Sequence, residues 1–420
     1  MSRSRPGKRR WRIVLALILG GAVALFLLVT SSAPWVPETR NATAEQVAMV
    51  RALANEARRS RATGEPVELE LDNTKLDALS AMMTQGFDPN RFEAKLEDGM
   101  LTLTGSRPLL FRWLNIRAQT SGTSEGIPPF AVRIGALSLP GWLSRLGLGV
   151  AQRRLAGEDG ALPPIDTIVR SISVREDTLT AQVVLPQGNL LAHVRATGVP
   201  AIDDRAVATI YCQLAEQQRS NPDPLLAHQL GRALAAAEPS PEGHRSALVA
   251  LALLSVGPEA GKVTGGSEGA IGKCAGAPVR LTLQGREDWA KHWALSAALE
   301  TTTGSRISAA IGEWKELADT LAKGPLLGPN DPSGFSFVDL ASDRAGILTA
   351  RQLTDPDRLA AARERLLAAQ DDMLLPQAAL SLSDGMTDAD FAARYGATDD
   401  PRFERKVDSI DAMLRRGGID

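Results

Sequence analysis

Aromatic residues and motifs of known chemistry are scarce in this chain of 420 residues. Aromatic side chains make up 4% of it, and Ala and Leu are abundant, which indicates an interior dominated by helix packing. The sequence has no Gly-x-Ser-x-Gly, dinucleotide fingerprint or His-Glu-x-x-His motif. The glycine-rich stretch 261–272 lacks the Gly-Lys-Ser/Thr ending of a phosphate cradle. Nucleotide chemistry is therefore excluded.

An excess of charge is also lacking. The formal net charge is −2, so nucleic acid is not an expected partner. The chain is 44% hydrophobic and 23% charged, as is usual for a globular protein and unlike a disordered one. Its length is sufficient for two domains with cores of their own.

One long uncharged run lies near the N-terminus. A basic segment, Arg3 to Arg12, precedes Ile13 to Trp35, about 23 residues without a charge. At 1.5 Å per helical residue this run predicts one transmembrane helix within residues 1–35. The basic segment would stay in the cytoplasm, which predicts a single-pass protein of the bacterial inner membrane with the bulk of the chain in the periplasm. A signal peptide cleaved after Ser31-Ser32-Ala33 is the alternative, disfavoured by Pro34 and by the length of the run.

Only two cysteines occur, Cys212 and Cys274, and their spacing matches no zinc motif. In an oxidising compartment they predict a disulfide, which closes a loop of about 60 residues and stabilises by about 4 kcal/mol. In the cytoplasm they would instead be small buried apolar residues.

Residues 42–198 predict an α+β module with an antiparallel sheet. An amphipathic helix over 45–64 precedes segments that alternate apolar and polar residues, and Asp98-Gly99 is a hairpin signal. Two segments, ELDNTKLDALSAMM and IGALSLPGWL, resemble the extracytoplasmic modules of YpmS-like membrane-anchored proteins. Such a sheet could hold an acyl chain on a concave apolar face, although a sheet covered by its own helices is the favoured interpretation.

Residues 203–420 predict a mainly α-helical domain. Helix-starting residues recur at Asp203 or Asp204, at Asp223 and at Ser240. The segment SALVALALLSVG is apolar on every side, which predicts a central core helix. Polar groups then recur at helical spacing, where residues three or four apart share one helix face. These groups are Asp288 and His292, then Glu313, Lys315, Glu316 and Asp319, and finally Asp339 and Asp343.

The same region resembles a family of uncharacterised bacterial envelope proteins. The matching residues are His292-Trp293, Lys315-Glu316 and the run GFSFVDLASDRAG, and a looser likeness extends to YfiM-like lipoproteins and VanZ-like proteins. Trp289 stands where those proteins have a Lys in an Asp-Lys-x-x-His pattern. The resemblance singles out His292, Lys315, Glu316, Asp339 and Asp343 and implies no mechanism.

Two functions follow from these residues. In one, His292, Glu316, Asp339 and Asp343 bind a divalent cation, or act as acid and base, in a hydrolase of peptidoglycan or lipid. In the other, which is favoured, the chain is a non-enzymatic cell-envelope binding or assembly factor with a protein or lipid-linked partner, and the polar groups organise a core. Ser336 as an N-cap three residues before Asp339 supports the structural role.

Overall fold

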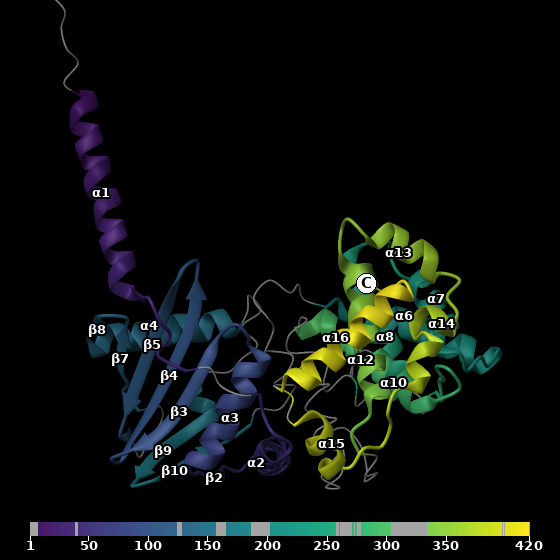
Figure 1. The fold of residues 1–420 in the computed structure, drawn as a ribbon, viewed down its shortest axis with the longest axis horizontal. Helices are drawn as coiled ribbons and strands as arrows, with labels where there is room; N and C mark the ends of the chain where they lie inside the picture. The colour runs from purple at the N-terminus through teal and green to yellow at the C-terminus, as the bar shows by residue number, and fades with distance from the viewer. Residues whose placement is uncertain are drawn as a thin grey trace, which may run out of the picture. The chain divides into compact units, whose positions relative to one another are not determined.

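The computed structural model describes residues 7–37, 41–123, 128–156, 165–185, 202–257, 260, 271–272, 274, 279–303, 334–396, 398 and 400–419. The chain forms two compact units, each with its own core. The β unit comprises 1–39, 65–152 and 165–184, and the helical unit comprises 40–64, 153–164 and 185–420. Figure 1 shows the strands gathered in the β unit and helices in the helical unit, so the predicted α+β class is confirmed.

Two antiparallel sheets form the β unit. The larger sheet has the order β3-β4-β5-β7-β8 with β1 beside β5, and the smaller has the order β2-β10-β9-β6. The strands are β1 (Thr30–Ser31), β2 (Val67–Leu71), β3 (Arg91–Glu97), β4 (Met100–Leu109), β5 (Arg112–Thr120), β6 (Gly122–Thr123), β7 (Ala131–Ile134), β8 (Leu137–Leu139), β9 (Val169–Arg175) and β10 (Thr178–Val183). The accompanying helices are α1 (Gly7–Val29), α3 (Asn73–Gly86), α4 (Gly141–Ala156) and α5 (Ile165–Ile168).

The predicted Asp98-Gly99 hairpin is confirmed. Asp98 and Gly99 have φ angles of 52° and 70°, and they join β3 to β4 with Glu97 opposite Met100. Both φ values lie in the left-handed region that a tight two-residue turn requires and that Gly adopts at little cost. This turn fixes the register of the first strand pair of the larger sheet.

Helix α3 closes the outer edge of β3. Three polar side chains on one side of the helix, Asn73, Ser80 and Thr84, accept hydrogen bonds from the backbone N–H groups of Leu96, Ala94 and Phe92 at 2.7, 3.0 and 3.0 Å. An open strand edge would present these donors unpaired and invite another chain to pair with them. These three N–H groups at the edge of β3 thus have hydrogen-bond partners within the β unit.

The predicted transmembrane helix is wrong. Helix α1 ends at Val29, so its uncharged part, Ile13 to Val29, spans only about 25 Å at 1.5 Å per residue, less than the ~30 Å of a bilayer core. Thr30–Ser31 pairs with β5, and Trp35 lies near the guanidinium groups of Arg117 and Arg133, at 5.2 and 5.7 Å. Across the described residues, no helix has the length and apolar character needed to cross a membrane. The predicted location, a single-pass protein of the inner membrane with most of the chain in the periplasm, rested on this helix and is also wrong.

The helical unit packs around a central apolar helix, as predicted. Helix α8 (Pro241–Val256) is buried at every residue from Ser246 to Ser255. The predicted caps Asp203 and Ser240 accept hydrogen bonds from backbone N–H groups at the starts of α6 and α8. The other helices are α2 (Ala44–Thr63), α6 (Asp204–Ser220), α7 (Leu226–Ala236), α10 (Glu287–Thr303), α12 (Phe337–Thr354), α13 (Leu359–Leu366), α14 (Asp371–Leu374), η1 (Gln377–Ser381), α15 (Asp388–Tyr395) and α16 (Pro401–Arg416).

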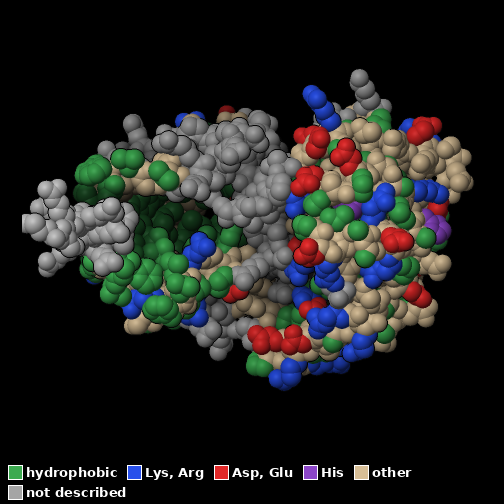
Figure 2. All heavy atoms as spheres, turned by 90° about the horizontal axis from the view of Figure 1, so that it is seen from above, with side chains coloured by type: hydrophobic (Ala, Val, Ile, Leu, Met, Phe, Trp, Pro, Cys, Tyr) green, Lys and Arg blue, Asp and Glu red, His purple; other side chains and the backbone are tan. Residues whose placement is uncertain are grey.

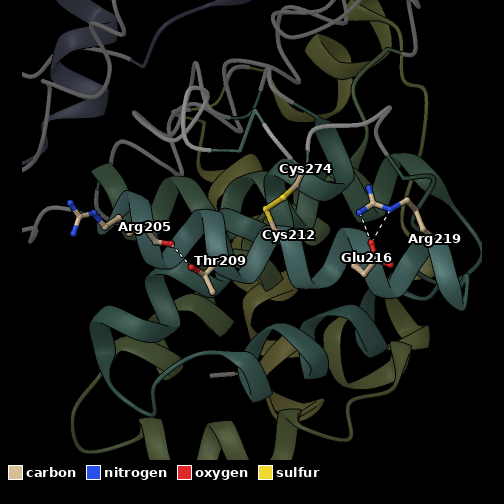
Figure 3. Close-up of a disulfide and its surroundings, with 6 residues drawn as sticks. All are labelled: Arg205, Thr209, Cys212, Glu216, Arg219 and Cys274. Atoms are coloured by element: carbon tan, nitrogen blue, oxygen red, sulfur yellow. Dashed lines mark hydrogen bonds and ion pairs between the residues drawn. A yellow bond between two sulfur atoms is a disulfide. The ribbon is translucent and has the colours of Figure 1, made fainter.

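The disulfide between Cys212 and Cys274 is confirmed. Figure 3 shows it joining the middle of α6 to the segment that contains Cys274, and the two Cα atoms are 5.3 Å apart. Along the same helix, Thr209 donates to the carbonyl oxygen of Arg205 at 2.8 Å and Arg219 pairs with Glu216 at 2.6 Å. The covalent link therefore anchors the chain that follows α8 to the outside of α6.

Candidate functional site

His292 lies between two carboxylates where α10 meets α12. Its Nδ1 is 3.1 Å from Oδ1 of Asp343 and its Nε2 is 3.4 Å from Oδ2 of Asp339. Ser296, one turn further along α10, donates its hydroxyl to the same Oδ1 of Asp343 at 2.6 Å. We call these four residues the His292 cluster. All are buried, at 4–8% relative exposure.

The hydrogen-bond roles of the two ring nitrogens depend on the protonation and tautomer of His292. A carboxylate only accepts hydrogen bonds, and a neutral imidazole has a single N–H, so one ring nitrogen would turn its lone pair toward a carboxylate. An imidazolium donates from both nitrogens and offsets part of the charge of the two acids. Ser296 was not predicted from the sequence, although its position four residues after His292 places it on the same helix face.

Of the other predicted members, Asp288 does not join this cluster. Asp288 instead accepts from Nε of Arg286 at 2.9 Å, and its side chain is 42% exposed. Partial burial would raise the pKa of Asp288, but the hydrogen bond and positive charge of Arg286 outweigh it and hold the pKa below its ordinary value. Lys315-Glu316 and their neighbours Glu313 and Asp319 lie outside the described residues.

The arrangement is not that of a serine hydrolase. In a catalytic triad the histidine takes the proton of the nucleophilic hydroxyl, whereas Ser296 donates to Asp343 and not to His292. In the described part of the chain, no three His, Cys, Asp or Glu residues form a group suited to a metal ion. The hydrolase and divalent-cation hypotheses, which also require Glu316, stay predictions.

The two helices that carry the cluster run parallel and approach closely. The residue numbers of the contacting pairs increase together along the two helices. Ser296 contacts Asp343, and further along Nε of Arg351 lies 3.2 Å from Oε1 of Glu300. Between these polar contacts Gly346 lies against Trp293, where an added Cβ would come within 2.2 Å of the Trp293 carbonyl oxygen. This close approach brings the short side chains of Ser296 and Asp343 into contact.

Gly346→Ala is therefore expected to destabilise the helical unit by about 1–3 kcal/mol, because the helix backbones must separate. The gain in helix propensity, about 1 kcal/mol, opposes this only in part. Gly147→Ala in α4 is the control, since nothing lies within 4 Å of its added Cβ. Denaturant unfolding of both variants checks the expectation, and a G346A protein as stable as wild type would contradict it.

A second polar group, not predicted from the sequence as a site, lies at the start of α7. Oδ2 of Asp223 is 2.9 Å from Nδ1 of His228 and 3.0 Å from Nη2 of Arg232, and its Oδ1 accepts from the backbone N–H of Leu225. Asp223, His228 and Arg232 line an open cavity of about 490 Å³ together with Gly231, Ala235 and residues 367–370. Partial burial would raise the pKa of Asp223, but the hydrogen bonds from Leu225 and His228 and the nearby positive charges lower it overall. Both oxygens are engaged, so Asp223 braces the first turn of α7.

The larger sheet of the β unit has one mainly apolar face, which also carries Arg107 and Arg112 near the β4–β5 turn, and one mainly polar face. The register places Leu103 opposite Ala94 and Ala118, and Ile116 opposite Ile134, all on the same face. Leu103 and Ile116 are 38% and 40% exposed. The apolar side chains of this face are Phe92, Ala94, Leu96, Leu101, Leu103, Leu109, Leu114, Ile116, Ala118, Val132, Ile134, Leu137 and Leu139.

One part of this apolar face is fully buried. Leu96 and Leu101 are buried in a cluster with Leu76, Leu179 and Ala181, which come from α3 and the smaller sheet. Figure 2 shows a hollow lined by hydrophobic side chains in the β unit, on the left of the view (dark green). We call this hollow, with the apolar face of the larger sheet, the apolar groove.

Models of known protein families, curated proteins and solved structures give no match to this chain. The resemblances to envelope proteins and to YpmS-like modules therefore stay predictions. The arguments for function rest on the geometry of the His292 cluster and of the apolar groove.

Proposed function

We propose that this protein is a non-catalytic lipid-binding protein, whose β unit holds an acyl chain in the apolar groove. The observation that carries the proposal is the apolar face of the larger sheet, which continues over five neighbouring strands and is largely half-buried or exposed. Soluble monomers rarely expose so extended an apolar surface unless it binds something. This proposal keeps the non-enzymatic binding role expected from the sequence and does not include the predicted location in the cell envelope.

The chemistry of the lining supports a hydrocarbon ligand. Leu103 and Ile116 lie on neighbouring strands and have no polar side chain between them, since Gly105 and Ala118 are their neighbours on that face. A ligand with many hydrogen-bonding groups would lose its water there without finding partners, which costs about 1–3 kcal/mol per group. An acyl chain has no such groups, and it gains about 0.8 kcal/mol for each buried CH₂.

The His292 cluster has a structural role in this proposal. Its side chains are at most 8% exposed, and both ring nitrogens of His292 already face carboxylates. A polymeric substrate would have to separate α10 from α12 to reach them. The contacts of His292 and Ser296 on α10 with Asp339 and Asp343 on α12 join the two helices, which is a structural role.

Leu103→Gln is expected to weaken the binding of a fluorescent fatty acid, dansyl-undecanoate, by tenfold or more. The amide would lose hydrogen bonds to water when the chain covers it, at a cost of about 1–3 kcal/mol. Thr102→Gln, one residue earlier on the polar face of the same strand, is the matched control and should bind like wild type. Fluorescence titration measures both affinities, and circular dichroism confirms folding. Absence of binding by wild type, or equal weakening by both variants, would refute the proposal.

A further inference from the structure

The turn between β4 and β5 exposes two large apolar side chains. Leu109 pairs with Arg112, so Leu110 and Phe111 form a two-residue turn. Leu110 is 88% exposed and Phe111 is 81% exposed, more than any other large hydrophobic residue described in the chain. Leu110 also has a φ of 55°, in the left-handed region that residues other than Gly, Asn and Asp rarely adopt.

Three other two-residue turns occur among the described strands of the β unit: Gly135-Ala136, between β7 and β8, has Gly at the position with positive φ, and the other two are built from polar residues and Gly. Asp98-Gly99 joins β3 to β4, and Glu176-Asp177 joins β9 to β10 with a φ of 49° at Glu176. Both are polar and suit exposure to water. The Leu110-Phe111 turn instead combines an unfavourable backbone angle with exposed apolar surface, two costs that the folded unit alone does not require.

The charge around this turn is positive. Residues 100–120, which form the β4–β5 hairpin, contain Arg107, Arg112 and Arg117 and no acidic residue. Arg107 is exposed and, among the residues described, has no ion-pair partner. Within the described ranges, the hydrogen bonds of the Arg112 guanidinium group go to uncharged oxygens of Thr30, at 2.7 and 2.8 Å, and these do not neutralise its charge. The tip thus combines apolar side chains with nearby positive charge.

We propose that the Leu110-Phe111 turn is the contact through which the β unit docks on an anionic lipid surface. The apolar pair enters the interfacial region and Arg107 and Arg112 meet the anionic headgroups, the combination that holds peripheral segments on such surfaces. Among the possible occupants, an anionic lipid surface satisfies both properties of the tip at once. The docking goes beyond fatty-acid binding in the apolar groove and does not require the groove to be filled.

The test uses the full chain and vesicles of phosphatidylcholine with or without phosphatidylglycerol. Leu110→Asn with Phe111→Gly places the favoured hairpin residues in the turn. This variant is expected to melt at the same or a higher temperature than wild type and to bind phosphatidylglycerol vesicles at least tenfold more weakly in sedimentation. Arg107→Gln is expected to bind them about fivefold more weakly, from a contribution of about 1 kcal/mol per arginine, and to bind neutral vesicles unchanged.

An environment-sensitive dye attached at the turn measures whether the turn enters the lipid. A nitrobenzoxadiazole label on Phe111→Cys is expected to shift its emission to the blue when phosphatidylglycerol vesicles are added, and the same label on Asp177→Cys, in the polar control turn, is not. Dansyl-undecanoate binding by the Leu110→Asn/Phe111→Gly variant should equal that of wild type, which separates docking from the groove. No shift at position 111, or equal vesicle binding by wild type and the turn variant, overturns the inference and assigns the exposed pair to a protein partner.

Discussion

Replacing His292 with alanine is expected to lower the free energy of unfolding of the helical unit by about 3–5 kcal/mol. The substitution removes the imidazole that lies between the buried carboxyl groups of Asp339 and Asp343. Removing one partner of a buried charge pair costs this much because the remaining charge keeps its desolvation penalty and loses its compensation. In addition, Oδ2 of Asp343 already has no hydrogen-bond partner among the described residues, so little is available to replace the imidazole.

Denaturant unfolding of wild type and two matched variants tests this expectation. His228→Ala removes a histidine that is also paired with an aspartate but whose side chain is 46% exposed, and it should cost less than 1 kcal/mol. His292→Leu combined with Asp339→Asn and Asp343→Asn should recover part of the loss, because no uncompensated charge stays buried.

The same variants separate the structural role from the cation hypothesis. The loss in H292A is expected to be equal with and without added zinc or manganese. A rise in the melting temperature of wild type on adding either metal, abolished in H292A, would contradict the structural role and support the predicted divalent-cation site. Because the readout is stability, it does not depend on knowing a substrate.

Helical spacing predicted which residues could share a face but not how the faces would meet. His292 and Asp343 come together because α10 and α12 run parallel in close contact around Gly346, which depends on a long connection through 304–336 that spacing does not constrain. Arg344 illustrates the limit: it follows Asp343 directly in the sequence, yet it pairs with Asp411 of α16. Residues adjacent in a helix point in different directions, so the partner had to come from another element.

Turns and helix caps were easier to predict from the sequence than whether helices cover the sheet. The Asp98-Gly99 turn and the caps Asp203 and Ser240 depend on a few neighbouring residues, and all three were predicted. Asp223 was also predicted to start a helix, but α7 has Leu225 as its N-cap, without a side-chain cap hydrogen bond. The alternation that gives the larger sheet an apolar face was also visible in the sequence. Whether helices cover that face depends on packing over long distances, and the sequence favoured a covered sheet where the structure has an exposed Leu103 and Ile116.

The transmembrane prediction failed for a related reason. Hydropathy counts uncharged residues, and the run Ile13 to Trp35 contains enough of them. Hydropathy does not predict where a helix ends. Here Thr30–Ser31 pairs with β5, and the helix ends at Val29. The remaining residues of the run pack on the polar face of the sheet, where backbone N–H groups of Trp35 and Val36 donate to Ser106.

Removing the disulfide, by Cys212→Ser with Cys274→Ser, is expected to lower the free energy of unfolding of the helical unit by about 4 kcal/mol and its melting temperature by about 10 °C. The link spans 62 residues of sequence, so its loss gives the unfolded chain the conformational freedom of a large open loop. That segment contains α7 and the core helix α8. The native packing of α8, buried from Ser246 to Ser255, does not depend on the sulfur atoms, so the effect arises mainly in the unfolded state.

Two comparisons identify the origin of that loss. Reduction of wild type should reproduce the melting temperature of the double serine variant, and the serine variant should not respond to reductant. Fatty-acid binding should stay at the wild-type affinity in both, because the apolar groove belongs to the β unit, which contains neither cysteine. Loss of helical circular dichroism in the variant at low temperature would contradict an effect on the unfolded chain, since it would show that the disulfide is needed to hold α6 and the segment after α8 in their native packing.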